Sequence, residues 1–541
     1  MSDLRYGYIQ EVHVRFLRRA TAALTVFLLV IGTGSAQKQG GTLRVYHRDS
    51  PASMSIYEET TLSTSMPMMG VFNNLVVFDP SQAQNRLDNI IPELAESWSV
   101  SENAKDMTFK LRSGVKWHDG KPFTANDVKC SWDLLLGKGQ EKLRVNARET
   151  WWTNLNDVTA DNQYQATFHL KRPQPSFLAL LASGFSPVYP CHVSPSEMRQ
   201  HPVGTGPFKF IEFKPNQSIK VGRNSDYWKS GRPYLDGIDY TIIPNRSTAM
   251  LAFAAGQFDL TFPYEITIAM LKDLRSQMPQ AVCEITPMNV SMNLSIGQKP
   301  PFDNIQVRRA IAMSLDRKAF IDILGDGQGD IGTALLPAPE GQWAMLKEAM
   351  EKLPGYDPDV KKSRAEAQNI MRALGYGPDA RINLKIVTRN LPDFRDPASI
   401  ASDQLKNIWI DSEVDAVETA NFLPRLMRSD FVLALTAIGS GLDDPDQNFY
   451  ENYICDSKRN YTRYCRHEVD SLIDQQSMET DAKKRHELVW EIDRRIQEDV
   501  ARPILYYMRK ATCWSPDVHG LKLQVNSIYN GWRMEDVWLN R

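Results

Sequence analysis

The sequence lacks the short motifs that mark several large classes of enzyme. It contains no Gly-Lys-Ser or Gly-Lys-Thr, which excludes the usual phosphate-binding loop of nucleotide hydrolases. His467 and His486 each precede a glutamate, but neither has the second histidine that a zinc protease requires. The Gly-Ser-Gly at 439–441 does not match the Gly-x-Ser-x-Gly that presents a nucleophilic serine. We therefore expect no catalytic residue, no cofactor and no bound metal.

The sequence also has no run of basic residues, no internal repeat and no low-complexity segment. Its 63 Lys and Arg residues are balanced by 65 Asp and Glu residues, and the net charge is −2. A nucleic-acid partner is therefore not expected, because such partners are bound through concentrated positive charge. Beyond residue 36, no apolar stretch approaches the ~18 residues that a membrane span needs, so we expect no such span there.

What is present begins with an export signal. Arg15, Arg18 and Arg19 precede the apolar run ATAALTVFLLVIGTG, and small residues follow in GSAQ. This order is typical of a signal peptide and places its cleavage after residue 36. We therefore expect residues 1–36 to be removed during ordinary secretion and the rest of the chain to be exported.

Six cysteines in an exported chain suggest disulfide bonds, whereas the absence of Cys-x-x-Cys disfavours a zinc site or a redox motif. Cys455 and Cys465 flank a short polar segment and are the best candidates for a bridge, which we expect to stabilise the chain by ~2–3 kcal/mol. The other four are far apart in the sequence and are expected to be buried or unpaired: Cys130, Cys191, Cys283 and Cys513.

Hydrophobic periodicity predicts an α/β protein of two or three lobes, since 541 residues exceed one ordinary domain. Alternating apolar residues predict strands at 40–48, 108–117, 164–170, 208–213, 217–223, 236–244, 382–388 and 431–439, and strand-like spacing returns at 520–538. Spacings of three and four predict helices at 304–324, 359–374 and 481–500. The first of these helices has a cap residue in Asp303 or Asn304, and Gly375 suits the position after the second.

Two glycines, Gly204 and Gly206, surround a threonine and at first suggest a phosphate-binding loop. Such a loop leads into a helix, whereas here Phe208 and Phe210 alternate with polar residues as in a strand. We therefore interpret the segment as the start of a strand, in which the glycines supply backbone angles that other residues resist.

Four long segments resemble the family-5 solute-binding proteins of ABC importers, the dipeptide-, oligopeptide- and nickel-binding group. In chain order they are PELAESWSVSENAKDMTFKLRSGVKWHDGKPFTANDVKCSWD, GTGPFKFIEFKPNQSIKVGRNSDYWKSGRPYLDGIDYTIIP, PPFDNIQVRRAIAMSLDRKAFI and DPDVKKSRAEAQNIMRALGY. The resemblance implies an α/β, two-lobed periplasmic-binding-protein-like fold (type II, cluster C) with an inserted domain and a hinged ligand cleft. It places lobe I at 37–80, 201–300 and 506–541, the inserted domain (domain II) at 81–200, and lobe II (domain III) at 301–505.

The same resemblance implies a role in transport. The chain would be a monomeric periplasmic protein that captures a peptide or peptide-like solute and delivers it to the membrane permease of an ABC transporter. An amine-free solute, such as an oligosaccharide or an opine, is the alternative cargo, and a periplasmic hydrolase is a distant alternative. Nickel and haem are disfavoured because the nine histidines form no cluster.

Peptide binders of this family hold the α-amine of their ligand with an aspartate that precedes an acidic residue and a proline. If Asp444 and the next proline align with that pair, Gly441 takes the place of the aspartate, and Asp443 substitutes only if the loop shifts by two residues. An α-amine ligand is then disfavoured, since a buried ammonium without a carboxylate costs several kcal/mol. In the other interpretation, Asp443, Asp444 and Asp446 form a capped, solvated loop.

The resemblance also suggests other ligand contacts. Arg389 or Arg395 would hold a carboxylate, because a guanidinium grips it with two hydrogen bonds, although either could equally be a surface residue. Trp343 either stacks on the cargo or packs within the protein. The remaining residues expected at the ligand are Tyr57, Thr61, Tyr264, Glu265 and Ser440.

Overall fold

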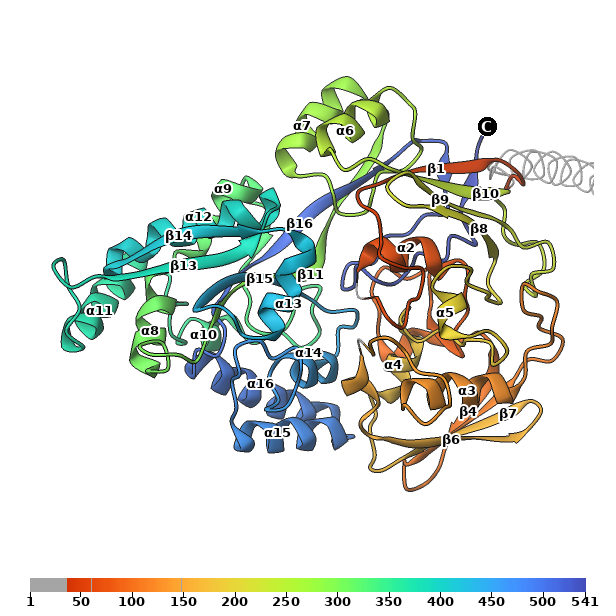
Figure 1. Ribbon diagram of the computed structural model, residues 1–541, viewed down its shortest axis with the longest axis horizontal. Coiled ribbons are helices and arrows are strands. Elements are labelled where there is room, and N and C mark those ends of the chain that lie inside the picture. Colours follow the sequence, from red (N-terminus) through yellow and green to blue (C-terminus); the bar gives the residue numbers. More distant parts are fainter. Residues whose placement is uncertain (1–36, 60, 147) are drawn as a thin grey trace, which may run out of the picture.

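The computed structural model describes residues 37–59, 61–146 and 148–541, so the expected signal peptide lies outside the described residues. The chain forms two lobes side by side, and the N-terminal third and the C-terminal end lie together in one of them (Figure 1). Within the described ranges, no helix is both long and apolar enough to cross a membrane. The names lobe I, inserted domain and lobe II are kept for the ranges given above, which stay a prediction.

Lobe I contains a four-stranded sheet of order β1-β10-β9-β8. Its strands are β1 (Thr42–His47), β10 (Gly237–Ile242), β9 (Ser218–Arg223) and β8 (Phe208–Lys214). Leu43 and Val45 are fully buried, as their alternation with polar residues predicts, and β1 runs parallel to β10. Around this sheet lie α2 (Leu62–Met69), α5 (Pro195–Met198), α6 (Arg246–Ala254) and α7 (Ile268–Gln277), with a small ladder of β2 (Val76–Phe78) and β3 (Ile90–Pro92) nearby.

The inserted domain is built on an antiparallel sheet of order β4-β5-β7-β6. Its strands are β4 (Ala95–Val100), β5 (Asp106–Leu111), β7 (Gln165–Leu170) and β6 (Leu155–Asn162), and its helices are α3 (Ala125–Leu135) and α4 (Phe177–Ala182). Phe168 packs edge-on against Trp132 of α3, with ring centroids 4.8 Å apart. This contact fixes the helix to the sheet.

A six-stranded sheet of order β12-β16-β11-β15-β13-β14 forms the centre of lobe II, although β11 and most of β16 belong to the sequence ranges of lobe I. The strands are β12 (Gly329–Asp330), β16 (Ile504–Trp514), β11 (Val282–Ile296), β15 (Leu433–Gly439), β13 (Ile382–Arg389) and β14 (Ile410–Val417). The helices are α8 (Ile305–Ser314), α9 (Arg317–Gly325), α10 (Lys347–Met350), α11 (Val360–Ala373), α12 (Pro392–Leu405), α13 (Thr419–Met427), α14 (Pro445–Asn452), α15 (His467–Met478) and α16 (Ala482–Glu498). β13 is parallel to both of its neighbours, whereas β11 is antiparallel to β15 and β16.

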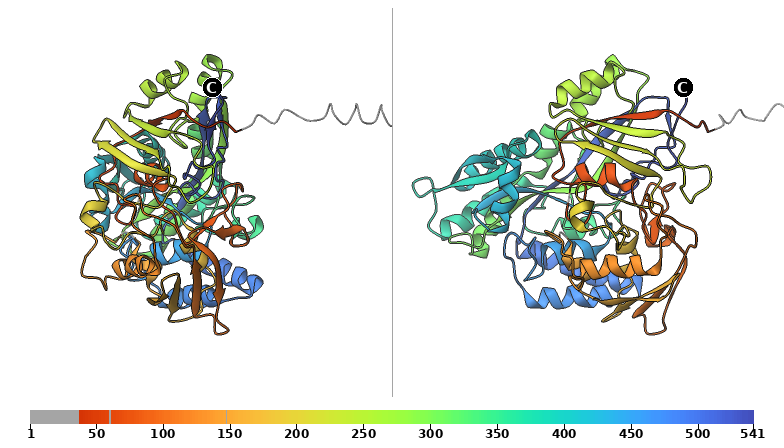
Figure 2. Two further views of the ribbon diagram at one scale, coloured as in Figure 1. Left: turned by 90° about the vertical axis from the view of Figure 1, so that its right-hand side faces the viewer. Right: turned by 45° about the vertical axis from the view of Figure 1, so that its right-hand side comes forward.

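Two long strands, β11 and β16, run from one lobe into the other (Figures 1 and 2). Trp514 at the end of β16 pairs with Leu260, and Leu260 pairs with Val45 of β1, so this ladder joins the two sheets. The register of β11 and β16 shifts between Pro287 and Ser291. Because bulges bend strands, we expect the hinge between the lobes at this shift.

The cysteine prediction is half right. Cys455 and Cys465 form the expected bridge, with Cα atoms 4.4 Å apart. Of the other four, Cys513 is buried as expected, but the expectation that these cysteines are unpaired is wrong. Two further bridges join Cys130 to Cys191 and Cys283 to Cys513, over 61 and 230 residues of sequence. The second pair are direct neighbours on β11 and β16, a proximity that only strand pairing creates.

Most expected strands and helices are confirmed, with two exceptions. The helix expected at 304–324 is two helices, because Leu315 is extended and the Asp316 side chain caps α9 by accepting from Ala319 N at 3.0 Å. The strand-like spacing at 520–538 does not give a long strand. The side chains of Ser527 and Asn530 in this segment instead donate to the carbonyl of Gly441, at 2.8 and 3.2 Å.

Gly204 and Gly206 start a strand as expected, but the reason given for the glycines is wrong. Neither has a positive φ. A Cβ on Gly204 would lie 1.8 Å from the carbonyl oxygen of Val71, and one on Gly206 would lie 2.5 Å from that of Gly70. The glycines are therefore required by the close approach of two backbone segments.

Candidate functional site

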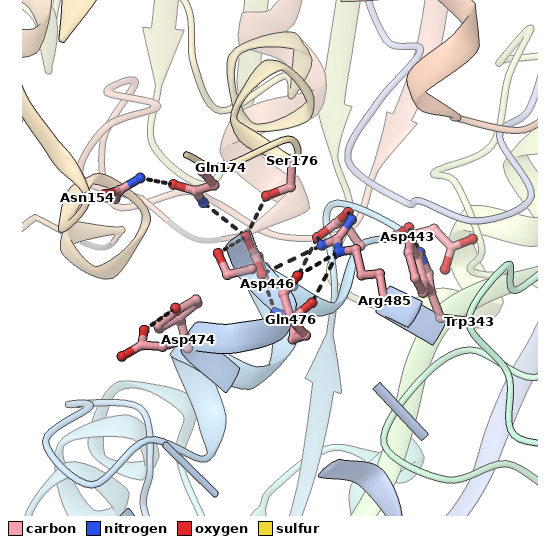
Figure 3. A network of polar contacts seen from close by, with 12 residues as sticks. Asn154, Gln174, Ser176, Trp343, Asp443, Asp446, Asp474, Gln476 and Arg485 are labelled. Atoms are coloured by element: carbon pink, nitrogen blue, oxygen red, sulfur yellow. Dashed lines mark hydrogen bonds and ion pairs between the residues drawn. The ribbon is translucent and has the colours of Figure 1, made fainter. Parts of the chain in front are cut away.

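The acidic segment at the start of α14 connects lobe II to the inserted domain (Figure 3). Asp444 caps α14 by accepting from Asp446 N at 3.0 Å, and its carboxylate accepts from Arg485 of α16 at 3.0 and 2.9 Å. Asp446 accepts from two residues of the inserted domain, from Gln174 Nε2 at 2.9 Å and from the hydroxyl of Ser176. Lobe II therefore contacts the inserted domain through a buried carboxylate.

The interpretation of this segment as a solvated loop is wrong, although the capping is confirmed. Asp444 is 6% exposed and Asp446 is 2% exposed. Within lobe II, Asp446 also accepts from Ser477 Oγ at 2.8 Å and from the side-chain amide of Gln476. Such a cluster is stable only with its cation in place, because a buried carboxylate without a partner is costly.

Asp443 lies beside this cluster, in a hollow lined by residues of lobe I, the inserted domain and lobe II. Its carboxylate accepts from Gln342 N at 2.9 Å and from Asn526 Nδ2 at 3.3 Å. Burial raises the pKa of Asp443 to about 6, and these hydrogen bonds only partly oppose the rise. Trp343 donates from its indole to the carbonyl of Asp443 at 3.0 Å and stacks on His486, so its ring packs within lobe II.

Because the pKa of Asp443 is raised, the folded chain binds more protons than the unfolded chain between about pH 4 and pH 6. Ionisation of Asp443 therefore reduces the free energy of unfolding as the pH rises through this window. We expect Asp443→Asn to be more stable than the wild type by about 3 kcal/mol at pH 7 and nearly equal to it at pH 4. Urea denaturation at pH 4, 5, 6 and 7 measures the difference, and a difference independent of pH would contradict the assignment.

A second set of contacts between the lobes surrounds Asp393 at the start of α12. It accepts from Arg246 of α6 at 3.1 Å and from Lys510 of β16. Burial alone would raise the pKa of Asp393, but Lys510 and Arg246 hold it well below its usual range. Glu265 accepts from the same Arg246 at 2.7 Å and lies 3.5 Å from Arg48. Glu265 therefore belongs to a network of paired charges in lobe I.

The other residues expected at the ligand are dispersed. Tyr57 is buried, stacks on Tyr189 and donates to a backbone carbonyl, and Tyr264 is buried and donates to the carbonyl of Gln524 at 3.1 Å. Thr61 is exposed at the start of α2. Arg389 lies over the ring of Phe394 at 5.3 Å, and burial and the nearby Arg48 lower its pKa.

Gly441 and Ser440 lie where all three parts of the chain meet. A Cβ on Gly441 would lie 3.5 Å from the ring of Phe185, a residue of the inserted domain. The ring of Tyr529 from lobe I lies 4.9 Å from that of Phe185, and the guanidinium of Arg148 lies 3.2 Å above it. Arg148, Phe185 and Tyr529 were not expected here from the sequence, because no spacing relates these three residues to Gly441.

The chain is similar to known proteins along most of its length. Residues 89–460 match the model of the bacterial extracellular solute-binding proteins, family 5. The di/tripeptide-binding protein 1 of Pseudomonas aeruginosa is 26% identical over 85% of this chain and 88% of its own length. Among solved structures, the periplasmic binding protein DppA of Helicobacter pylori in complex with the peptide STSA has a TM-score of 0.80 at 23% identity, covering 93% of this chain and 99% of that one. The binding protein AgaA of A. tumefaciens R10 in complex with agropinic acid has a TM-score of 0.79 at 21% identity, with the same coverage.

Proposed function

The chain belongs to family 5 of the bacterial extracellular solute-binding proteins, and from this premise we propose that it captures a peptide or peptide-like solute in the periplasm and delivers it to the permease of an ABC importer. The fold class expected from the sequence, two α/β lobes of the periplasmic-binding-protein type, is confirmed. Members of this family are substrate-binding transport proteins. By extension we propose that this chain is not an enzyme.

The observation that best supports this role is the way in which the two lobes meet. They are joined by two bent strands, β11 and β16, and contact each other through polar pairs such as Asp393 with Arg246. Polar contacts between lobes can break and form again as a hinge opens and closes, because water replaces them at small cost. A carrier must enclose its solute and later release it, and this arrangement suits both steps.

The names of the similar proteins suggest the nature of the solute. Di- and tripeptides and the peptide STSA are named for relatives of this chain, which favours a peptide-like cargo. A second candidate is an amine-free solute, as in the complex with agropinic acid. The absence of a carboxylate side chain at Gly441 favours this second candidate.

Binding by residues 37–541 tests the proposed function directly. We expect at least one di- or tripeptide or opine to raise the melting temperature, since a ligand at a hundred times its Kd stabilises a protein by about 2.7 kcal/mol. Differential scanning fluorimetry against a peptide and opine library, together with mass spectrometry of co-purified solutes, measures this. Recovery of the solute chemically unchanged is the second expected result. A cleaved solute, or no stabilisation by any compound, would contradict the proposal.

A further inference from the structure

We propose that the space beside Gly441 binds a carboxylate of the solute, so that the cargo carries a negative charge and no free amine at this end. The inference rests on the proposed function and makes the solute class more specific. Five residues, here called the Arg148 subsite, define the place: Arg148, Phe185, Gly441, Arg459 and Tyr529. They come from the inserted domain, lobe II and lobe I, so the subsite is complete only when the lobes are together.

Arg148 is a buried cation without an acidic partner among the described residues. Its side chain is 5% exposed, and its Nη1 donates to the carbonyls of Ile56 at 3.4 Å and Glu59 at 3.1 Å. Burial lowers its pKa to about 9, although the carboxylate of Glu451 opposes this effect from a distance. Nε and Nη2 of Arg148 make no hydrogen bond within the part of the chain that the structure describes. A guanidinium in this state favours an anion that supplies two acceptor oxygens.

Arg459 adds a second guanidinium, and its acidic partner is Glu451. Nη1 of Arg459 lies 3.3 Å from Glu451, while its Nε is buried and without a hydrogen-bond partner. Glu451 also accepts from Trp151 Nε1 at 2.8 Å and from Gln447 Nε2 at 3.4 Å. Because the oxygens of Glu451 are already engaged, it is poorly placed to receive an ammonium. Two guanidiniums and one carboxylate leave a single positive charge uncompensated.

Arginine side chains also lie near the hydroxyl of Tyr529. Burial raises the pKa of the Tyr529 hydroxyl, and Arg459, Arg148 and Arg48 all lie near enough to oppose the rise. The side chain of Arg459 is 29% exposed, so solvent can reach it. Because these arginines are positively charged, an anion is favoured at the Arg148 subsite over a cation of the same size.

The geometry favours a carboxylate over a phosphate. Phe185 and Tyr529 contact each other in tilted orientation, with ring centroids 4.9 Å apart, and Arg148 lies over the ring of Phe185 at 3.2 Å. One uncompensated positive charge matches the single charge of a carboxylate, whereas a phosphate monoester carries nearly two. A Cβ at Gly441 would lie 3.5 Å from the ring of Phe185 and 3.6 Å from Gln447 Oε1, so glycine keeps a side chain from covering the ring on the lobe II side.

Three peptides that differ only at the N-terminus test the charge preference. Isothermal titration of residues 37–541 would compare Met-Leu, N-acetyl-Met-Leu and N-succinyl-Met-Leu, which carry a positive, a neutral and a negative group there. We expect the succinyl peptide to bind on the order of a hundredfold more tightly than the free amine, and the acetyl peptide to lie between them. Agropinic acid serves as a carboxylate-bearing probe of another shape, and a phosphonoacetyl peptide tests the phosphate alternative.

Variants locate the preference in the subsite. Arg148→Gln and Arg459→Gln are each expected to weaken succinyl-peptide binding by tenfold or more and to leave Met-Leu unchanged or bound more tightly. Gly441→Asp adds a carboxylate to the subsite and should reverse the preference toward the free amine. The exposed Arg372 of α11 provides the control, since Arg372→Gln should change neither affinity. Without solute, Arg148→Gln should melt no lower than the wild type, because it removes a buried unpaired charge.

The results of these experiments test the carboxylate assignment separately from the proposed transport function. If Met-Leu binds most tightly and Arg148→Gln does not alter the order, the carboxylate assignment is wrong while the transport role stands. Tighter binding of the phosphonoacetyl peptide would likewise overturn the assignment to a carboxylate. If no probe of any charge binds, the proposed function fails, and the inference fails with it.

Discussion

Replacing Arg485 with alanine is expected to lower the free energy of unfolding by about 3–5 kcal/mol. Arg485 is 3% exposed and donates to both carboxylate oxygens of Asp444, and its guanidinium lies 3.6 Å from Asp446. The substitution leaves two buried carboxylates without a cation, and their desolvation is then uncompensated. Urea denaturation at pH 7, followed by circular dichroism, measures the loss.

Two further variants separate this effect from a general weakening of α16. The double variant Arg485→Met with Asp444→Asn should recover most of the loss, because it removes the cation and one buried charge together. Arg494 provides the control on the same helix, since it pairs with Glu491 and Glu498 on the exposed side. Arg494→Ala should cost less than ~1 kcal/mol. Equal losses for Arg485→Ala and Arg494→Ala would show that the buried cluster is not the cause.

Gly204→Ala is expected to destabilise the chain by about 3 kcal/mol or more, because its Cβ would lie 1.8 Å from the carbonyl oxygen of Val71. A backbone carbonyl cannot rotate away as a flexible side chain does. It is held here because Val71 O also accepts from Gly206 N at 2.9 Å. The whole contact between the start of β8 and the residues after α2 would have to shift. Thermal and urea denaturation measure the loss.

Gly325 at the end of α9 is the matched control. It also lacks a positive φ, but no atom lies within 4 Å of the Cβ that alanine would add. Gly325→Ala should therefore be neutral or stabilise the chain by ~0.4–1 kcal/mol, through lower entropy of the unfolded state. If Gly204→Ala proves as mild as Gly325→Ala, the close approach of the two backbones is not what requires glycine.

The hydrophobic pattern predicted the strands and helices well, since burial on one face is a local property of the chain. Leu43 and Val45 in β1 and Phe109 in β5 are buried as their alternation requires. The prediction of a helix was wrong where the same local pattern of residues fits two different structures. At 304–324 the helical spacing continues through Leu315, yet the cap formed by Asp316 divides the helix. The spacing of the apolar residues does not reveal that the helix is divided, because Asp316 suits both an exposed position within a helix and a cap at its start.

The candidate site was harder to predict than the fold. The departure at Gly441 pointed to a place where residues of lobe I, lobe II and the inserted domain meet, because a resemblance fixes the order of residues along the chain. Asp444 and Asp446 were interpreted as loop residues, although their burial depends on Arg485 and Gln174, which come from distant segments. The residues next to an aspartate in the sequence do not indicate whether a distant cation will pair with it in the folded protein.

By itself, the sequence determined the α/β class, the family and the bridge between Cys455 and Cys465, because each rests on residues close together or in a fixed order. Only the tertiary structure decided which other cysteines pair, why Gly204 is a glycine, and which side chains surround Gly441. Arg148, Phe185 and Tyr529 reach that place from separate parts of the chain. Contact between distant segments follows from the packing of whole lobes, and short-range spacing carries no information about it.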